Sequence, residues 1–338
     1  MPVNIRDIAK AAGVSVATVS KALNGYSTVN AATRAKIQRI AEEMQYHPNS
    51  AARSLVGQRS MTIGVFLTTG LANPFFAGVL GGIDRALKDR GYDLIYLAQA
   101  HAEEPGYSLM RHCRSRNVEG LLVFGMQEND MDFSELIGSG LPVVFIDMEM
   151  EGEHVGMISS DNAEAIRAEV QHLAGLNHRR IAFISGIAGT YPGRMRERGF
   201  LQGMAEQGLD RRPEYMIPGD YSRESGYEGM RRLLSLPERP TAVICCSDAS
   251  AVGALEAALE QGLSVPDDLS IVGFDDVEAA RSVRPALTTV RQDMQGIGYQ
   301  AVGLLDDLIR GEELAEKRII LPTEWVERDS CGPAKESR

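Results

Sequence analysis

Polar side chains that can bind hydroxyl groups stand at several points where a predicted strand ends and the chain turns toward a helix. Asp147 follows one such strand, and the pairs Ser247–Asp248 and Asp275–Asp276 follow two others. A carboxylate can accept hydrogen bonds from two neighbouring hydroxyls of a polyol. A single aspartate at such a position could equally be a helix cap. Several of them in one chain favour a binding site for a small polyhydroxylated ligand.

Asn73, Arg196 and Tyr221 add further binding chemistry to these carboxylates. An arginine fork donates hydrogen bonds to hydroxyl or carboxylate oxygens, and an aromatic ring can stack on the apolar face of a sugar. Asn73 follows the first predicted strand. The combination of acids, a guanidinium and an aromatic ring therefore predicts a sugar-like ligand.

Patterns typical of catalysis or metal binding are missing from the sequence. There is no Gly-Xaa-Ser-Xaa-Gly elbow, Walker loop or His-Glu-Xaa-Xaa-His motif, and the six histidines are scattered. His172 and His178 flank a predicted helix end, where a solvated capping role is expected. The four cysteines have neither the spacing of a zinc site nor the density of a disulfide scaffold. We predict no enzyme activity, no catalytic residues, no metal and no cofactor.

The elements that must position the polar residues follow an alternating pattern beyond residue 60. Apolar β-branched runs alternate with amphipathic stretches, which is typical of parallel sheets flanked by helices. The predicted strands are 63–67, 94–98, 120–124, 143–147, 181–185, 216–219, 242–246 and 270–274, and the predicted helices are 76–90, 106–117, 163–175, 196–208, 222–235 and 249–261. This pattern predicts an α/β fold with two doubly wound lobes. A ligand is then expected at the carboxyl ends of the strands, between the lobes.

Length and composition limit the class of protein. A chain of 338 residues, 44% hydrophobic and 24% charged, is typical of a soluble globular protein with at least two domains. Its longest apolar stretches are under ten residues, well below the roughly 20 that cross a bilayer. The first residues carry charge where a secretory leader is apolar. We expect no membrane association and a cytoplasmic location.

The first 60 residues differ from the rest in charge and pattern. They hold eight Lys and Arg against three Asp and Glu, whereas the whole chain has a net charge of −11. This asymmetry favours a polyanion partner, although clustering by chance is the alternative. Asn4 caps a predicted helix at 5–12, Gly13 ends it, and Ser15 caps a second helix at 16–24. A third helix at 31–45 completes a helix-turn-helix unit with a small apolar core.

The outer face of the second helix suits a DNA major groove. It presents short side chains followed by the cation Lys21, and a groove about 12 Å wide admits such a helix. Exposed helices with Ser and Thr are common in other proteins as well. In the segment 47–60, Asn49 can cap a short helix that is unstable alone. Leu55 beside Arg53 fits an apolar wedge for the minor groove, and a plain linker is the alternative.

Residues 5–24, 33–34 and 46–55 resemble the DNA-binding headpiece and hinge of the lactose/galactose repressor (LacI/GalR) family. The resemblance implies that Val16, Ala17 and Lys21 read operator bases and that Leu55 opens the central base step. Lys21 stands where most members have arginine, so a bidentate contact to guanine is in question there. The complete set of predicted DNA contacts is Ile5, Ser15, Val16, Ala17, Thr18, Ser20, Lys21, Asn24, Thr33, Asn49, Ala52, Arg53 and Leu55.

The remainder resembles the periplasmic-binding-protein-like core of the same family. The stretches that carry this resemblance are 73–77, 142–147, 196–200, 219–221, 247–248, 272–276 and 285–292. Ser247 stands where many members have asparagine, and the segment 189–193 follows no ligand-defining pattern. The implied effector contacts are Phe76, Asp147, Arg196, Tyr221, Ser247, Asp275 and Gln292.

The sequence thus predicts three parts. Residues 1–46 form the headpiece, 47–60 the hinge helix and linker, and 61–338 a two-lobed domain for effector binding and dimerisation. The first lobe takes about 61–160 and 293–322, and the second about 161–292 and 323–330.

The predicted function is that of a sequence-specific repressor of carbohydrate-utilisation genes. A homodimer would bind double-stranded DNA at a palindromic operator, and a sugar or sugar derivative would change its affinity. Three alternatives stay open: a solute-binding protein with an incidental basic start, a sugar-modifying enzyme, and a carbon-catabolite regulator that responds to a phosphorylated carrier protein. Residues 218–222 resemble the last branch too.

Overall fold

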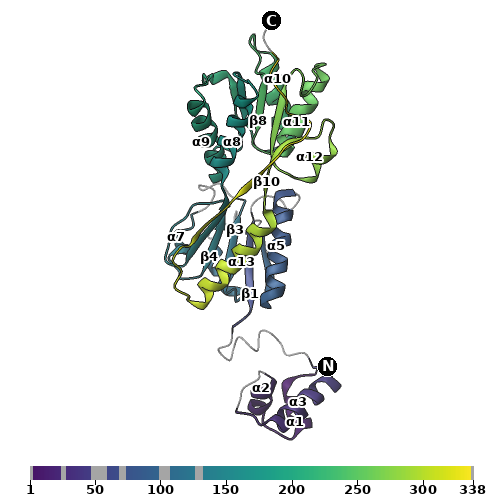
Figure 1. The fold of residues 1–338 in the computed structure, drawn as a ribbon. Coiled ribbons are helices and arrows are strands. Elements are labelled where there is room, and N and C mark those ends of the chain that lie inside the picture. The colour runs from purple at the N-terminus through teal and green to yellow at the C-terminus, as the bar shows by residue number, and fades with distance from the viewer. Residues whose placement is uncertain are drawn as a thin grey trace. The chain divides into compact units, whose positions relative to one another are not determined.

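The computed structural model describes residues 3–23, 28–46, 59–67, 74–98, 107–125 and 132–335. The chain divides into two compact units, Met1–Ser60 and Met61–Arg338. Figure 1 shows the helices and strands of each unit.

The first unit contains three short helices, α1 (Ile5–Ala12), α2 (Val16–Leu23) and α3 (Ala31–Glu43). The Asn4 side chain accepts hydrogen bonds from two backbone N–H groups of α1, and the left-handed Gly13 ends that helix. Ile8, Val19, Ala22 and Ile37 are fully buried and form the centre of the core. The predicted helix-turn-helix unit is therefore present.

The second unit contains two six-stranded sheets, and each sheet is the centre of one lobe. The first lobe has the strand order β11-β5-β4-β3-β1-β2 and pairs all of them in parallel. Its strands are β1 (Thr62–Leu67), β2 (Asp93–Ala98), β3 (Gly120–Phe124), β4 (Val143–Ile146), β5 (Val155–Ser160) and β11 (Arg318–Leu321).

The second lobe has the strand order β12-β10-β9-β8-β6-β7, and only β12 runs antiparallel to its neighbour. Its strands are β6 (Ile181–Ile184), β7 (Met216–Ile217), β8 (Ala242–Cys245), β9 (Ser270–Asp275), β10 (Thr288–Gln292) and β12 (Thr323–Val326). The predicted fold class, an α/β protein with two doubly wound lobes, is confirmed.

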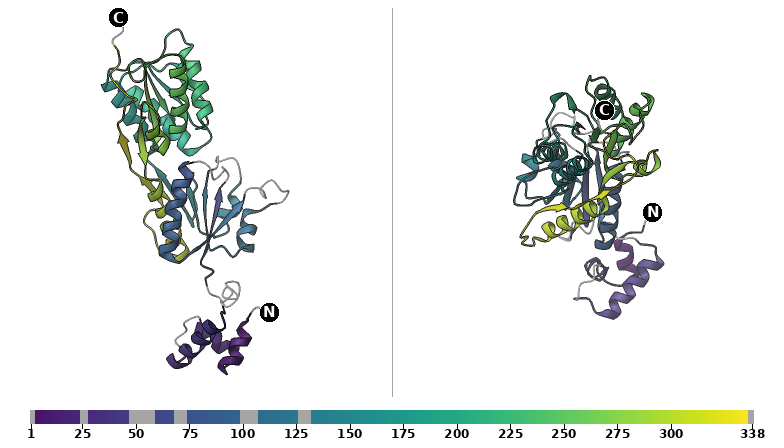
Figure 2. Two further views of the ribbon diagram at one scale, coloured as in Figure 1. Left: turned by 90° about the vertical axis from the view of Figure 1, so that its right-hand side faces the viewer. Right: turned by 45° about the horizontal axis from the view of Figure 1, so that its top comes forward.

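Helices cover both faces of each sheet, and Figure 2 shows this layering from two further directions. In the first lobe, α5 (Pro74–Arg90) and α13 (Met294–Arg310) lie opposite α6 (Leu109–Ser115) and α7 (Ser134–Ile137). In the second, α8 (Asn162–Gly175) and α9 (Tyr191–Glu206) lie opposite α10 (Arg223–Leu234) and α11 (Asp248–Glu260), with the short α12 (Glu278–Ser282) beside α11. A 3-10 turn, Pro213–Tyr215, precedes β7.

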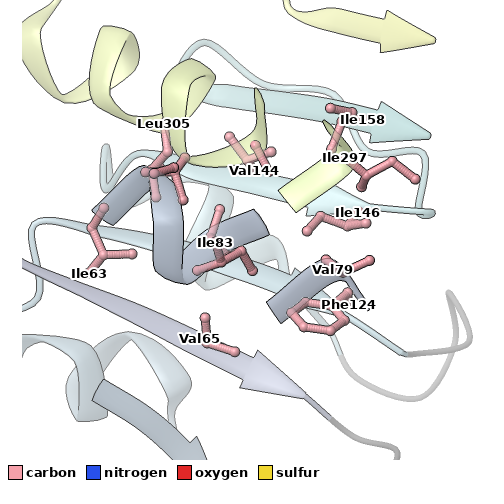
Figure 3. Close-up of a cluster of buried hydrophobic side chains, with 14 of the residues drawn as sticks. Ile63, Val65, Val79, Ile83, Phe124, Val144, Ile146, Ile158, Ile297 and Leu305 are labelled. Carbon is pink, nitrogen blue, oxygen red and sulfur yellow. The ribbon is translucent and has the colours of Figure 1, made fainter. Parts of the chain in front are cut away.

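The core of the first lobe is closed by the close approach of α5 and α13 (Figure 3). A Cβ atom at Gly82 would lie 2.0 Å from the carbonyl oxygen of Gln295, and one at Gly298 would lie 2.0 Å from that of Val79. Only glycine fits at these two positions. The helices can therefore pack backbone to backbone over the sheet.

The chain passes between the lobes three times within residues 132–335, after β5, after β10 and between β11 and β12. In Figure 1 the yellow C-terminal strands run from one lobe to the other. Both α8 and α13 begin within two residues of a crossing. Side chains at the crossings therefore lie where the two lobes meet.

Candidate functional site

Arg196 is the central residue of the predicted effector site. It lies on α9, is 4% exposed, and its guanidinium carbon lies 3.7 Å from the centroid of the Phe274 ring. Its Nε donates to Asn162 Oδ1 at 2.7 Å, and its Nη1 donates to the carbonyl of Cys246. Its Nη2 lies 4.0 Å from Asp275 Oδ1. Each guanidinium nitrogen thus faces an oxygen atom of the second lobe.

A chain of hydrogen bonds joins Arg196 to the first lobe through the crossing that follows β5. Asn162 Nδ2 donates to Ser159 Oγ at 3.1 Å, and Ser159 Oγ donates to Asp147 Oδ1 at 2.5 Å. Burial raises the pKa of Asp147, and the hydrogen bond from Ser159 and the charge of Arg196 oppose that rise. The carboxylate of the first lobe is therefore coupled to the guanidinium of the second.

Asp275 and Gln292 extend this chain of hydrogen bonds to the crossing that follows β10. Gln292 ends β10, is 4% exposed, and its Nε2 donates to Asp275 Oδ1 at 2.7 Å. Among the described residues its Oε1 is buried without a hydrogen-bond partner. Burial raises the pKa of Asp275, opposed first by Arg196 and then by Gln292. A buried acceptor without a donor is a candidate contact for a ligand hydroxyl.

Three of the predicted effector contacts hold a left-handed backbone. The φ angles of Asp147, Tyr221 and Asp275 are 58°, 68° and 121°. Such a conformation costs on the order of 1 kcal/mol or more for a residue other than glycine, and it collects at functional sites. The strain falls on residues at the carboxyl ends of strands, where binding sites of such sheets lie.

Tyr221 is held by two neighbours. Its hydroxyl lies 2.9 Å from Thr190 Oγ1, and its backbone carbonyl accepts from Ser247 Oγ at 2.8 Å. A Cβ at Gly186 would lie 2.1 Å from the Tyr221 ring, so only glycine leaves room for the ring at this position. Ser247 also accepts from the backbone N–H of Ser250 as the cap of α11. The Ser247 side chain therefore positions Tyr221 and the helix.

Phe76 occupies a different setting from the other predicted contacts. It is 9% exposed, and its ring centroid lies 5.3 Å from that of Phe124 in the core of the first lobe. The structure thus brings together Asp147, Arg196, Tyr221, Ser247, Asp275 and Gln292, and places Phe76 in the apolar core. Residues 68–73, which precede α5 and include Asn73, lie outside the described residues.

Sequence reasoning did not select several residues of this site. Ser159 and Asn162 stand at the crossing after β5, which no sequence motif indicates. Tyr191 lies in the segment 189–193, which follows no ligand-defining pattern. Glu169 on α8 is fully buried, and both of its carboxyl oxygens lack a partner among the described residues. Burial raises its pKa, and the charge of Arg196 opposes the rise. Arg196 is thus the cation that Asp147, Asp275 and Glu169 share.

Asp248 lies at the start of α11 behind the site, where it accepts hydrogen bonds from Thr289 Oγ1 at 2.6 Å and from the backbone N–H of Val277 at 2.8 Å. Burial raises its pKa to about 8, and the neighbouring Asp275 adds to the shift. By contrast, Asp276 pairs with Arg281, Arg291 and Arg328. Burial acts to raise the pKa of Asp276, but hydrogen bonds from these three arginines lower it to about 2.

The raised pKa of Asp248 predicts that stability falls as the pH rises. The folded protein holds this proton more tightly than the unfolded chain, whose aspartates have a pKa of about 3.9. The contribution is fully present below that value and is lost as the pH rises toward about 8. Between about pH 5 and about pH 8.5, the midpoint of thermal unfolding should fall more steeply in the native protein than in Asp248→Asn. The amide of this variant would keep both hydrogen bonds, because the Thr289 hydroxyl can turn to accept.

Asp210→Asn is the control for this comparison, since Asp210 is exposed. Its pH profile should match that of the native protein. Parallel profiles for Asp248→Asn and the native protein would contradict the prediction.

The predicted DNA contacts of the first unit lie mainly on α2. Ser15 Oγ accepts from the backbone N–H of Thr18 at 3.1 Å and lies 2.8 Å from Thr18 Oγ1, so it caps the helix. Val16 is 41% exposed, and Ala17 and Lys21 are exposed too. Ala17 and Lys21 are four residues apart and lie on the side of α2 away from the buried Val19 and Ala22, so this side of the helix is exposed to a partner.

The other predicted DNA contacts have mixed settings. Ser20 and Thr33 are half-buried, and the backbone N–H of Thr33 donates to the Asn30 cap of α3 at 2.8 Å. Ile5 packs against the core of the unit. Asn24, Asn49, Ala52, Arg53 and Leu55 lie outside the described residues.

Neither a metal site nor a membrane-spanning helix is found among the described residues. These residues contain no group of three or more His, Cys, Asp or Glu arranged to hold a metal ion. In that same part of the chain, every helix is too short or too polar to span a bilayer.

Comparison with known proteins decides the family. Residues 4–49 match the model of bacterial regulatory proteins of the lacI family, and residues 170–331 match that of the periplasmic binding protein-like domain. A probable HTH-type transcriptional repressor, ExuR of Bacillus subtilis (strain 168), is 33% identical over 97% of this chain and 98% of its own. The chain belongs to the LacI family. The protein is therefore a DNA-binding transcriptional regulator, as predicted.

Other transcriptional regulators resemble this protein over nearly their whole length. The HTH-type transcriptional repressor PurR of Erwinia tasmaniensis is 35% identical over 99% of both chains. The lac repressor dimer bound to operator and the anti-inducer ONPF has a TM-score of 0.85 and 29% identity, over 98% of this chain and 99% of that one. The transcriptional regulator CelR in complex with cellobiose has a TM-score of 0.71 and 29% identity, over 97% and 99%.

Proposed function

We propose that this LacI-family protein represses carbohydrate-utilisation genes in the cytoplasm and that a sugar-like effector changes its operator affinity. The observation that carries the proposal is the series of linked polar side chains that leads from Asp147 through Arg196 to Gln292. It places carboxylates of both lobes around one guanidinium at two chain crossings. A ligand bound there would contact both lobes at once.

The chemistry of the site supports a polyol as the effector. Asp147 and Asp275 can accept hydrogen bonds from sugar hydroxyls, and Gln292 Oε1 is a buried acceptor without a donor among the described residues. Arg196 can exchange a protein acceptor for a ligand oxygen, and the Tyr221 ring offers a face for the apolar side of a sugar. The similarity to CelR in complex with cellobiose supports the same ligand class. Phe76 and Ser247 complete the proposed contacts.

The free face of α2 supports the proposed operator contacts. Val16, Ala17 and Lys21 would read bases, while Ser15, Thr18, Ser20 and Thr33 would contact the backbone. The remaining contacts would come from Ile5, from Asn24 and from the hinge segment 47–60. The similarity to a lac repressor dimer on its operator supports a homodimer at a palindromic site.

Coupling between the two sites would run through the lobe crossings. A ligand that binds one arrangement of the lobes more tightly shifts the population toward it. The shift in operator affinity equals the coupling free energy, which is typically about 1–3 kcal/mol. The first lobe would transmit the change, since β1 follows the hinge segment directly.

One titration tests the proposal. Duplexes that the full-length protein selects from a random library are labelled with a fluorophore, and binding is followed by anisotropy at fixed salt. We expect a palindromic consensus, and we expect at least one neutral mono- or disaccharide to change the affinity by about tenfold or more. A duplex with one half-site scrambled is the control. Selection of no palindrome would contradict the operator proposal, and a response to purines alone would contradict the sugar proposal.

A further inference from the structure

Tyr191, Arg318 and Glu149 form a contact between the lobes beside the proposed effector site. Tyr191 is the first residue of α9 in the second lobe, and Arg318 is the first residue of β11 in the first. Arg318 Nη2 donates to the Tyr191 hydroxyl at 3.0 Å, and its Nη1 pairs with Glu149. The hydrogen bond joins residues 127 positions apart in the chain.

The position of this contact links it to the binding residues. Glu149 follows Asp147 by two residues, and Asp147 and Glu149 both add to the rise in the Tyr191 pKa that burial causes. Thr190, next to Tyr191, caps α9 and meets the Tyr221 hydroxyl. The Tyr191 residue is 4% exposed, whereas the Arg318 and Glu149 side chains are 47% and 44% exposed. The contact therefore lies at the rim of the site, with its tyrosine directed inward and its charges in solvent.

We infer that Tyr191, Arg318 and Glu149 act as an interlobe latch that favours the lobe arrangement in which they meet, here called closed, and controls access to the effector site. The inference rests on the proposed effector site. The latch consists of protein side chains alone, so it holds the lobes whether or not a ligand lies between them. Glu149 orients the arginine, and the tyrosine hydroxyl accepts its hydrogen bond from across the lobe boundary.

The strength of the latch should be that of one hydrogen bond with a charged donor at a half-exposed position. Solvent screens the charge at such a position, so the bond changes an equilibrium by about three- to tenfold. A change of this size alters the ratio of the two lobe arrangements, and it leaves the fold of each lobe intact. Tyr191→Phe removes the hydroxyl and keeps the buried ring, so it tests the hydrogen bond without a cavity.

Spin labels on the two lobes can report the closed and open populations in the full-length protein without any ligand. Glu135 on α7 and Arg198 on α9 are exposed positions, one in each lobe, that can be replaced by cysteine. Cys331 is replaced by serine in this background, because it is half-buried while the other three cysteines are buried. Pulsed electron resonance then gives the distribution of distances between the labels.

Tyr191→Phe and Arg318→Met should each raise the ratio of long to short distances by about three- to tenfold. The double variant should add nothing to the single ones, because both remove the same bond. Tyr227→Phe is the matched control, since it removes a tyrosine hydroxyl bonded to Glu260 on the surface of the second lobe. It should leave the distribution unchanged.

Two results would overturn the latch. One is an unchanged distance distribution in both Tyr191→Phe and Arg318→Met. The other is a native distribution without a closed population. Neither result depends on a sugar, so failure of the latch is distinguishable from failure of the proposed effector.

Discussion

Arg196→Leu should lower the affinity for a sugar effector by about a hundredfold or more. The substitution removes donors from Asn162 and from the Cys246 carbonyl, and it removes the cation that Asp147, Asp275 and Glu169 share. A charge-assisted hydrogen bond to a buried ligand contributes about 1.5–3 kcal/mol, and the loss of the cation that orients Asp147 and Asp275 adds to this effect. Isothermal titration with the sugar that acts on the operator complex measures the effect.

The same substitution should also lower the free energy of unfolding, by about 3 kcal/mol or more, because it leaves buried acceptors and carboxylates unpaired. Arg196→Lys separates binding from folding. It keeps the charge but lacks the planar fork, so it should fold more stably than the leucine variant and still bind the sugar weakly.

Arg198→Leu is the matched control for both variants, because Arg198 is an exposed residue of the same helix. It should bind the sugar with native affinity. If Arg196→Lys bound the sugar as tightly as the native protein, the guanidinium fork would not be the binding group.

Val16→Glu should weaken operator binding by about a hundredfold while leaving the first unit folded. Val16 is 41% exposed at the start of α2, and that turn contains no acidic residue. A carboxylate there would meet the negative charge of DNA. The same carboxylate interacts favourably with the positive end of the helix dipole. Folding and DNA binding are thus expected to change in opposite directions.

Anisotropy with the selected operator, together with thermal unfolding of each protein, measures both effects. Gln38→Glu is the control, because it adds the same charge at an exposed position of α3. It should weaken binding only by the small long-range effect of one charge. Equal operator affinities for Val16→Glu and the control would exclude α2 as the helix that enters the groove.

Much of the fold follows from local patterns in the sequence. Buried central strands such as β3 and β8 are continuous apolar runs, and these are the strands that the sequence predicted. The pattern missed β5 and β10, which contain serines, threonines and a glutamine. It also missed β11 and β12, in which no residue is fully buried. All four strands lie next to the crossings between the lobes, and β11 and β12 are also edge strands.

Glycines explain why the helix α13 was missed, and a proline explains why α9 was expected to begin too late. The helix α13 contains Gly296, Gly298 and Gly303, each of which lowers helix propensity by about 1 kcal/mol. Contact with α5 requires one of them, Gly298, and no local pattern reveals such a contact. The helix α9 was expected to begin at 196 but begins at Tyr191, because Pro192 is compatible with a first turn.

The residues of the candidate site likewise fall into two groups: those that the sequence reveals and those that only the tertiary structure reveals. Asp147 and Asp275 could be selected because each follows a predicted strand, Arg196 and Tyr221 because of their binding chemistry, and Gln292 by resemblance alone. Ser159 and Asn162 owe their roles to the crossing between β5 and α8, a feature of tertiary structure. Tyr191 and Arg318 are 127 residues apart in the sequence, so only the fold reveals their contact.

The three crossings also determine which motion the lobes can perform. A single connecting segment would act as a swivel and allow rotation about any axis. Three segments side by side restrict the rotation of one lobe against the other, so we expect the lobes to move mainly by a hinge bend at the crossings. Two polar residues of the proposed site, Asn162 and Gln292, stand directly beside these crossings. A ligand that rearranges these two side chains would therefore change the preferred angle between the lobes as well as the distance between them.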